Sequence, residues 1–477
     1  MSVDRSPARG GTVGPRLFAA LAVALAACVM LSVPVGVLAG DRESPITRAI
    51  NFLFNQQVRR PLPVVDGGRI VDFPGDWPQY FQLQGSEFRV RDVSPFTVAF
   101  IHHSLTHIVE DNRRVLGLRP IDIDVARVMR QRAVGFIRAF ESAPGAPDAG
   151  TFAFWPYDTD PDTPDRWLEI LLTAWLRGPI LGGQRVPINL PIYPHTLAIP
   201  SDADVTATSY AALLDDARLD GGPGSEVAFE RFFEDWRDLG VVPRRVNPPW
   251  MPPASGAFLT WLTYRNPPTP LFPNDVDLVV NGNVLYALAH YRRLATPGVA
   301  DAVELIDRVT ALGIHRDRLE EISNYYPDNL AFQYVVSRAY YEGVRALEPA
   351  VNILADDLEH AALVRADGAA YWDKGDPQLN TAFAVLALLN AGRDAPIIDN
   401  AIDYLISEQN ALGGYQEATF FVGRTDGGQV FQFTSAAFTT AIVLEAFARY
   451  ELAYCTRAGD GPPSARQHAC RDLRISQ

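Results

Sequence analysis

Cysteine is scarce in this sequence, with only 3 in 477 residues, and an excess of positive charge is missing. Cys455 and Cys470 lie near the C-terminus, and neither stands in a catalytic motif. Lys and Arg total 42 against 56 Asp and Glu, which gives a formal net charge of −14. A chain this acidic lacks the basic face that nucleic-acid phosphates require. We therefore expect no nucleic-acid partner.

Charge is absent from residues 17–39, an apolar run that follows three arginines. A signal peptide would be cut after Ala39, where small residues occupy the cleavage positions. An uncleaved helix would be long enough to span a membrane, with its start in the cytoplasm. Alternatively, the sequence LAAC at residues 25–28 resembles the lipobox of bacterial lipoproteins and would acylate Cys28. Each interpretation places the rest of the chain outside the cytoplasm, either secreted or anchored to the outer face of the membrane.

The domain organisation follows from this start and from the composition of the end. Residues 1–40 are the predicted signal peptide or membrane anchor, residues 41–454 one folded domain, and residues 455–477 a tail rich in glycine and proline. In an oxidising compartment Cys455 and Cys470 are expected to form a disulfide that pins this tail. Two unpaired thiols are the alternative.

The mature chain repeats a pair of helix patterns. One member of each pair is amphipathic and should lie outside, beginning near Ala49, Ala133, Ala228, Ala302, Ala350 and Ala401. The other member is apolar or small on nearly every face, so it must be surrounded by protein; examples are DVTATSYAALL and DPQLNTAFAVLALLNAG. Outer helices alternating with inner ones predict an all-α fold, a closed (α/α)6 toroid.

The ends of the outer helices carry a recurring glutamine and an aromatic residue. In AIDYLISEQNALGGY, Gln409 is followed by Gly413, Gly414 and Tyr415, while AINFLFNQQ supplies Gln56 or Gln57, and DGAAYW supplies Gly368 and Trp372. This pattern resembles the repeat of the terpenoid cyclase and protein prenyltransferase superfamily, as in squalene cyclases. The resemblance implies that the glutamine ties the helix end to the next turn while the aromatic ring packs on it.

Paired aspartates begin two of the predicted inner helices. The stretch DADVTA, residues 202–207, resembles the Asp-x-Asp-Asp-Thr-Ala motif of the cyclases that act by protonation, which implies that Asp204 is the proton donor beside Asp202. Val205 departs from the motif, whose last aspartate stands there. Asp275 and Asp277 would supply the missing charge if both pairs face one cavity. The alternatives are that these acids only cap their helices, or that they bind a cation or a diphosphate–metal group.

Zinc chemistry of the prenyltransferase type is not expected, because that branch uses an Asp-x-Cys pair and no predicted inner helix contains cysteine.

A calcium loop is one interpretation of DTDPDTPDRWLE, where alternate acids precede a glutamate. A solvated acidic loop is the alternative. The residues concerned are Asp158, Asp160, Asp162 and Glu169.

Two histidines, His103 and His107, are one helical turn apart in HHSLTH, with Asp111 a further turn on. That spacing permits a metal pair, whereas buried histidines satisfied by hydrogen bonds are the alternative.

Aromatic residues are candidates for a cavity wall, where they would shield a carbocation or stack on sugars, and packing between turn and helix is the alternative. They are Trp77, Trp155, Trp372 and Tyr210, which follows Ser209.

Three functions fit these features. The first is an exported, terpenoid-cyclase-like enzyme that cyclises or binds an isoprenoid in a central cavity. The second is a carbohydrate-active (α/α)6 enzyme of the cell envelope, because two carboxylates suffice for glycoside cleavage. The third is a non-catalytic binding or scaffold toroid. The expected partners are a small-molecule or glycan substrate and a membrane at the N-terminus. No cofactor is required for these reactions, although calcium remains open.

Overall fold

The computed structural model describes residues 43–59, 74–85, 89–111, 116–142, 144–145, 148–154, 201–225, 227–244, 246–262, 274–424 and 430–457. The chain divides into two compact units, Met1–Ser44 and Pro45–Gln477. Nearly all of the described residues belong to the second unit. Within the described residues, no helix is both long and apolar enough to cross a membrane. The segment 17–39, Trp155, the proposed calcium loop and Cys470 fall outside the described residues, as does the side chain of Cys455.

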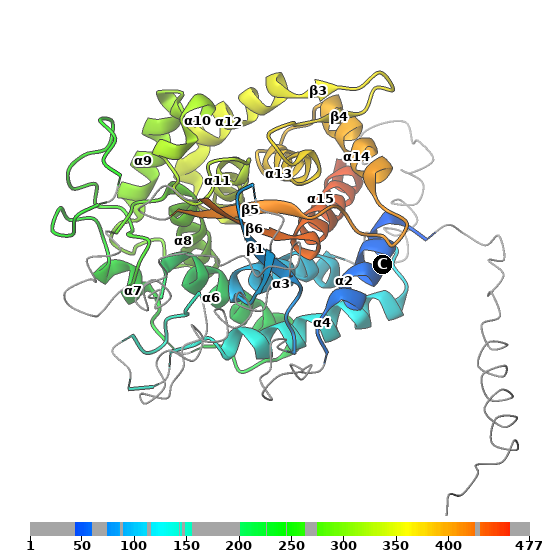
Figure 1. Cartoon of the computed structure of the whole chain (residues 1–477), viewed down its shortest axis with the longest axis horizontal. Helices are drawn as coiled ribbons and strands as arrows, with labels where there is room; N and C mark the ends of the chain where they lie inside the picture. Colours follow the sequence, from blue (N-terminus) through cyan, green and yellow to red (C-terminus); the bar gives the residue numbers. More distant parts are fainter. Residues whose placement is uncertain are drawn as a thin grey trace, which may run out of the picture. The chain divides into compact units, whose positions relative to one another are not determined.

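Helices dominate the second unit, as the all-α prediction requires (Figure 1). The amphipathic helices, expected outside, are α2 (Pro45–Gln56), α4 (Pro120–Arg138), α7 (Glu230–Asp235), α9 (Val299–Ala311), α12 (Glu348–Ala361) and α14 (Pro396–Glu408). The apolar helices, expected inside, are α3 (Pro95–Asp111), α6 (Ala203–Asp220), α8 (Leu278–His290), α11 (Ala331–Glu342), α13 (Pro377–Asn390) and α15 (Ala436–Arg457). Short helical turns follow α9 and α11, at α10 (Ile314–Asp317), η2 (Leu319–Glu321) and η3 (Arg345–Leu347).

The apolar helices contact one another in the order α3, α6, α8, α11, α13 and α15, and α15 packs against α3. Each amphipathic helix other than the short α7 packs on one or more of them from outside; α9, for example, lies on α8 and α12 on α11 and α13. Burial follows the sequence pattern: every residue of 278–289 in α8 is buried, whereas α9 buries one stripe. A helix without a polar face finds no stable place at a surface, so its neighbours must enclose it.

A small antiparallel sheet, absent from the sequence prediction, joins the two ends of this unit. Its strands are β1 (Gln79–Leu83), β2 (Arg89–Asp92), β5 (Ala418–Arg424) and β6 (Val430–Ser435), in the order β2-β1-β6-β5. A separate two-stranded ribbon pairs β3 (Leu363–Val364) with β4 (Ala370–Tyr371). Residues just ahead of α11 and α13 hold β5, since Asn329 Nδ2 donates to Phe420 O at 2.8 Å and the Thr419 amide donates to Asp376 Oδ2 at 2.9 Å. The sheet therefore lies against the N-terminal ends of the apolar helices.

Gln409 makes the contact that the resemblance implies for the glutamine of the repeat. Gln409 Nε2 donates to the carbonyls of Pro45 and Gly413 at 2.9 Å each, which ties the end of α14 to its turn and to α2. Three aromatic side chains then repeat one contact, a hydrogen bond to a carbonyl near the end of an amphipathic helix. The pairs are Trp77–Leu53 at 2.8 Å, Trp372–Leu358 at 2.9 Å and Tyr415–Leu405 at 2.8 Å.

Candidate active site

Two of the four predicted acids cap their helices. Asp202 is the N-cap of α6 and accepts a hydrogen bond from the Val205 amide at 2.7 Å. Asp277 is the N-cap of α8 and accepts from the amides of Val279 and Val280 at 2.8 and 3.2 Å. A carboxylate at this position satisfies amides that the helix itself cannot bond and interacts well with the helix dipole.

Asp204 is bound differently, because it lies inside the first turn of α6. Its two oxygens accept hydrogen bonds from side chains of other elements: the Asn283 amide of α8 at 2.5 Å and the Tyr326 hydroxyl at 2.5 Å. Only 6% of Asp204 is exposed. A carboxyl group held by two side-chain donors in a buried place has a fixed orientation.

Burial perturbs the acidity of the cluster. It raises the pKa of Asp204 to about 6, while the hydrogen bonds from Tyr326 and Asn283 lower it and so limit the rise. Burial also raises the pKa of Asp277 to about 7, against the lowering effect of the Ser323 hydroxyl bond. Both shifts favour the protonated form of these carboxyls relative to an exposed aspartate.

The acids also influence one another. The pKa of Asp202 stands well above its usual value, first because of burial and then because of the charge of Asp204. The charge of Asp204 likewise raises the pKa of Asp277 across the α6–α8 contact. Asp275 is buried beside them and accepts a hydrogen bond from the Tyr325 hydroxyl at 3.0 Å. Asp202, Asp204 and Asp277 thus form one electrostatic group at adjoining helix starts.

A line of polar contacts leads from this cluster towards the middle of the helices. Asn283, which donates to Asp204, accepts a hydrogen bond from the guanidinium of Arg338 in α11. That guanidinium lies over the rings of Tyr286 and Phe100, at 4.2 and 4.7 Å from their centroids. A cation in this position gains from the negative faces of the rings and lowers the pKa of Asp204 through its charge.

Aromatic rings surround the other partner of Asp204. The ring of Tyr326 lies 6.2 Å from both Phe96 of α3 and Phe421 of β5. Phe421 in turn stacks on Phe433 of β6 at 4.0 Å. The β5–β6 hairpin therefore supplies an aromatic cover next to the acid cluster.

The space between these side chains is small. A cavity of about 10 Å³, bordered by His103, Thr208, Asp215 and Arg338 among others, has room for about one water molecule. A second hollow of the same volume lies beside Asp275. Small-molecule sites usually measure about 300–1,000 Å³. The described residues around Arg338 are thus closely packed, rather than arranged about the deep cavity that the cyclase hypothesis expects.

Three of the four predicted cavity aromatics lie within the described residues, and each of these packs between a turn and a helix. Trp77 and Trp372 are 0% and 3% exposed, and their indole nitrogens bond the helix carbonyls described above. Tyr210 donates to the Gly150 carbonyl at 2.6 Å and stacks on Phe229. These contacts match the packing alternative, so we assign the three rings to it.

The sequence analysis gave no role to Asn283 or Arg338 and did not connect the loop residue Tyr326 with Asp204, although one signal was available. Arg338 and Glu445 are lone charged residues within otherwise apolar or aromatic stretches, YVVSRAYY and AIVLEAFA. A charge inside a fully buried helix must be paired or hydrogen-bonded, so each marks a polar contact in the interior. Tyr326 and Asn283 carry no comparable signal, because their roles depend on which helix starts meet.

No protein-family model matches the chain, and neither does any curated protein. Among solved structures, the chain is similar to the type II terpene cyclase MstE from Scytonema, with 13% identity, 86% of this chain and 98% of that chain covered, and a TM-score of 0.47. It is similar, too, to a variant of that cyclase in complex with its substrate geranylgeranyl dihydroxybenzoate, with 12% identity, 86% and 97% coverage and a TM-score of 0.49. Similarity at this level does not extend to substrate or reaction.

Proposed function

We propose that this chain is a terpenoid-cyclase-like (α/α)6 toroid in which Asp204 protonates an alkene of an isoprenoid. The observation that carries the proposal is the environment of Asp204, a buried carboxyl with a pKa raised to about 6 and a fixed orientation. The successive contacts of the apolar helices, closing from α15 to α3, support the toroid. The DADVTA sequence, with Asp204 in the place of the family's acid, supports the reaction.

Asp204 suits the role of donor better than its neighbours. Asp202 and Asp277 accept hydrogen bonds from backbone amides, and those bonds would be weakened by moving either carboxyl. Asp204 accepts one hydrogen bond at each oxygen, and each oxygen keeps a second lone pair on which a proton can sit. After the proton has left, Tyr326 and Asn283 stabilise the carboxylate, which makes Asp204 the stronger acid.

The reaction needs no cofactor. The proton moves from Asp204 to one alkene carbon, and the alkene π electrons form the new C–H bond. The resulting carbocation then closes a ring by attack of a second alkene, and it loses a proton to give an isomer of the substrate. Aromatic faces such as those of Phe96 and Phe421 lie beside Tyr326 and would stabilise positive charge by cation–π contact.

Close packing sets a condition on this proposal. An isoprenoid would reach Asp204 only by displacing side chains, and the aromatic residues of β5 and β6 are among those that lie beside its partner Tyr326. The same packing favours a second candidate function, a non-catalytic scaffold toroid in which the acids cap helices. An open groove with two exposed carboxylates, as a glycosidase requires, is not what the described acids form, since the four are 1–6% exposed.

We further propose that the protein acts outside the cytoplasm, on the basis of the apolar segment 17–39 and the arginines before it. Water-soluble isoprenoid diphosphates would be confined to the cytoplasm, so a membrane-dissolved polyprene is the favoured substrate. Fusion of residues 1–60 to a reporter that is active only after export tests this location. Failure of the fused reporter to become active would contradict it.

Deuterium transfer tests the reaction. The purified protein is incubated with polyprenes in D2O, and products are analysed by mass spectrometry for one added deuterium. We expect labelled cyclic product from the wild-type protein and from Asp376→Asn, a half-buried acid ahead of α13, but none from Asp204→Asn. Products that persist in Asp204→Asn would reject Asp204 as the donor. A protein that binds no polyprene and forms no labelled product would leave the scaffold as the better conclusion.

A further inference from the structure

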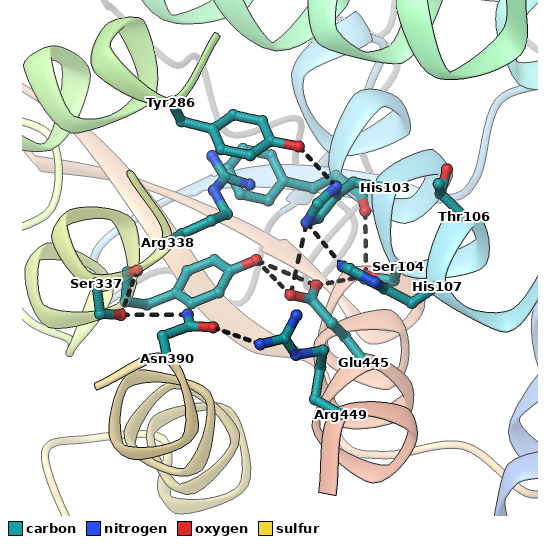
Figure 2. Close-up of polar contacts among 12 residues, drawn as sticks. His103, Ser104, Thr106, His107, Tyr286, Ser337, Arg338, Asn390, Glu445 and Arg449 are labelled. Carbon is teal, nitrogen blue, oxygen red and sulfur yellow. Dashed lines mark hydrogen bonds and ion pairs between the residues drawn. The ribbon is translucent and has the colours of Figure 1, made fainter. Parts of the chain in front are cut away.

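A second cluster of ionisable groups lies apart from the acid pairs, where the first and last apolar helices meet (Figure 2). It consists of His103 and His107 on α3 and Glu445 on α15. The two Nε2 atoms of the histidines are 3.3 Å apart, and His103 Nε2 lies 3.6 Å from Glu445 Oε1. One ligand atom from each of the three residues lies within 4.8 Å of the other two.

We propose that His103, His107 and Glu445 bind a divalent transition-metal ion of the zinc type. Zinc bonds to imidazole nitrogen and carboxylate oxygen are about 2.0–2.2 Å long, so a tetrahedron of such ligands has edges of about 3.3–3.6 Å. Two of the three edges in the cluster, at 3.3 and 3.6 Å, already match this value. A small rotation of the Glu445 carboxylate would complete the third edge, and a water molecule would supply the fourth ligand.

His103 and Glu445 are each held from behind by a described partner. The Tyr286 hydroxyl lies 3.1 Å from His103 Nδ1. With the Nδ1 proton donated to that hydroxyl, Nε2 keeps its lone pair for a metal. Ser104 and Tyr334 donate hydrogen bonds to Glu445 at 3.0–3.1 Å. Outer partners of this kind orient metal ligands in known sites, and α8 and α11 provide two of them here.

The charges around the cluster permit a cation. Glu445 brings a carboxylate to the two imidazoles, and its Oε1 lies 3.6 Å from His103 Nε2. Glu445 and Asp215 favour positive charge near His107, whereas Arg449 opposes it.

The position of the cluster gives the ion a structural consequence. The ligands come from α3 and α15, whose contact closes the succession of apolar helices. A bound ion would add coordination bonds between these two helices, on top of the Ser104–Glu445 hydrogen bond at 3.1 Å. We therefore expect the metal to stabilise the folded chain without entering the protonation chemistry of Asp204, so this inference goes beyond the proposed function and does not depend on it.

Cobalt titration tests the site. The full chain is treated with a chelator, dialysed, and titrated with Co²⁺ alone, whose visible absorption reports tetrahedral nitrogen and oxygen ligands. We expect one equivalent to bind and zinc to displace it. His107→Ala and Glu445→Gln should abolish the absorption, and Tyr286→Phe should weaken binding roughly tenfold, the usual cost of losing an outer partner. His360→Ala, which removes an exposed histidine, should bind as the wild-type protein does.

Two results would overturn the proposal: no stoichiometric binding by the wild-type chain, or binding that His107→Ala leaves unchanged. Circular dichroism shows whether each variant is folded. If a variant fails to fold, X-ray absorption of the zinc-loaded wild-type protein identifies the zinc ligands. Two imidazole nitrogens and a carboxylate oxygen bound to zinc would support the site. Any sulfur ligand, or oxygen ligands alone, would reject it. Thermal melts with and without zinc measure the stabilisation, which should be lost in His107→Ala.

Discussion

The acid cluster makes the stability of the protein depend on pH, and Asp204→Asn removes one carboxyl together with its coupling to Asp202 and Asp277, which acts in the same direction. The folded-state pKa of Asp204 is raised from 3.8 to about 6 by burial. A raised pKa means that folding favours the protonated form, so its contribution is fully present below the unfolded pKa and is lost as the pH rises through 6. The full loss is about 3 kcal/mol, at about 1.4 kcal/mol per pKa unit.

Urea denaturation at several pH values between 4 and 8 measures this loss. From the two pKa values, we expect Asp204 to remove about 2–3 kcal/mol of unfolding free energy over that range. The asparagine side chain of the variant cannot ionise, so the stability of the variant relative to the wild-type protein should rise by that amount from pH 4 to pH 8. Parallel curves for the two proteins would refute the conclusion that Asp204 is buried with a raised pKa. Asp124→Asn, at an exposed position on α4, is the control. Its unfolding free energy should depend on pH in the same way as that of the wild-type protein.

Three further predictions use neighbouring residues. Tyr326→Phe removes a hydrogen bond to a charged group, worth about 1.5–3 kcal/mol, so the pKa of Asp204 should rise by about 1–2 units. The upper pH limit of activity should then move upwards by the same amount. An unmoved limit would contradict the donor role. Arg338→Met leaves nearby carboxylates without a counter-charge and should lower the unfolding free energy by about 3–5 kcal/mol in urea titrations, while a loss below about 1 kcal/mol would show that the arginine is not needed there. Gly282→Ala would place a Cβ 2.6 Å from Val335 at the α8–α11 contact and should cost about 1–3 kcal/mol, so unchanged stability would disprove this close approach.

The alternation of helix types could be predicted from the sequence because a fully buried helix and a half-buried helix differ in the distribution of their apolar residues. Helix α8 carries apolar or small residues on nearly every face and is buried on every face, whereas α9 has one apolar stripe and buries that stripe. The capping positions of Asp202 and Asp277 were readable for a similar reason, since a cap depends only on the first turn that follows it. These features are local, and the sequence therefore predicts them well.

The sheet and the partners of Asp204 could not be predicted in the same way. Strand β1 pairs with β6, although about 350 residues separate Tyr80 from Thr434, and no local pattern specifies such a pairing. Tyr326 reaches Asp204 across a separation of 122 residues. Its hydroxyl is placed by the loop before α11, so its role appears only when the starts of α6 and α11 lie near each other. The third member of the histidine cluster, Glu445, was missed for the same reason. The sequence places Asp111 one helical turn after His107, whereas Glu445 comes close to the two histidines only in the folded chain.

Val205 stands where the protonating motif has its last aspartate, and under the proposed function Asp277 would supply the charge that this position lacks. The charge of Asp204 raises the pKa of Asp277, which means that the two carboxyls interact although they belong to different helices. Val205 itself is 1% exposed, so an aspartate there would be a further buried acid in an already crowded cluster. Each added carboxyl raises the pKa values of the others and favours the protonated form. A crowded group of acids can thus be assembled from two helix starts as well as from one, provided that the two helices pack against each other as α6 and α8 do.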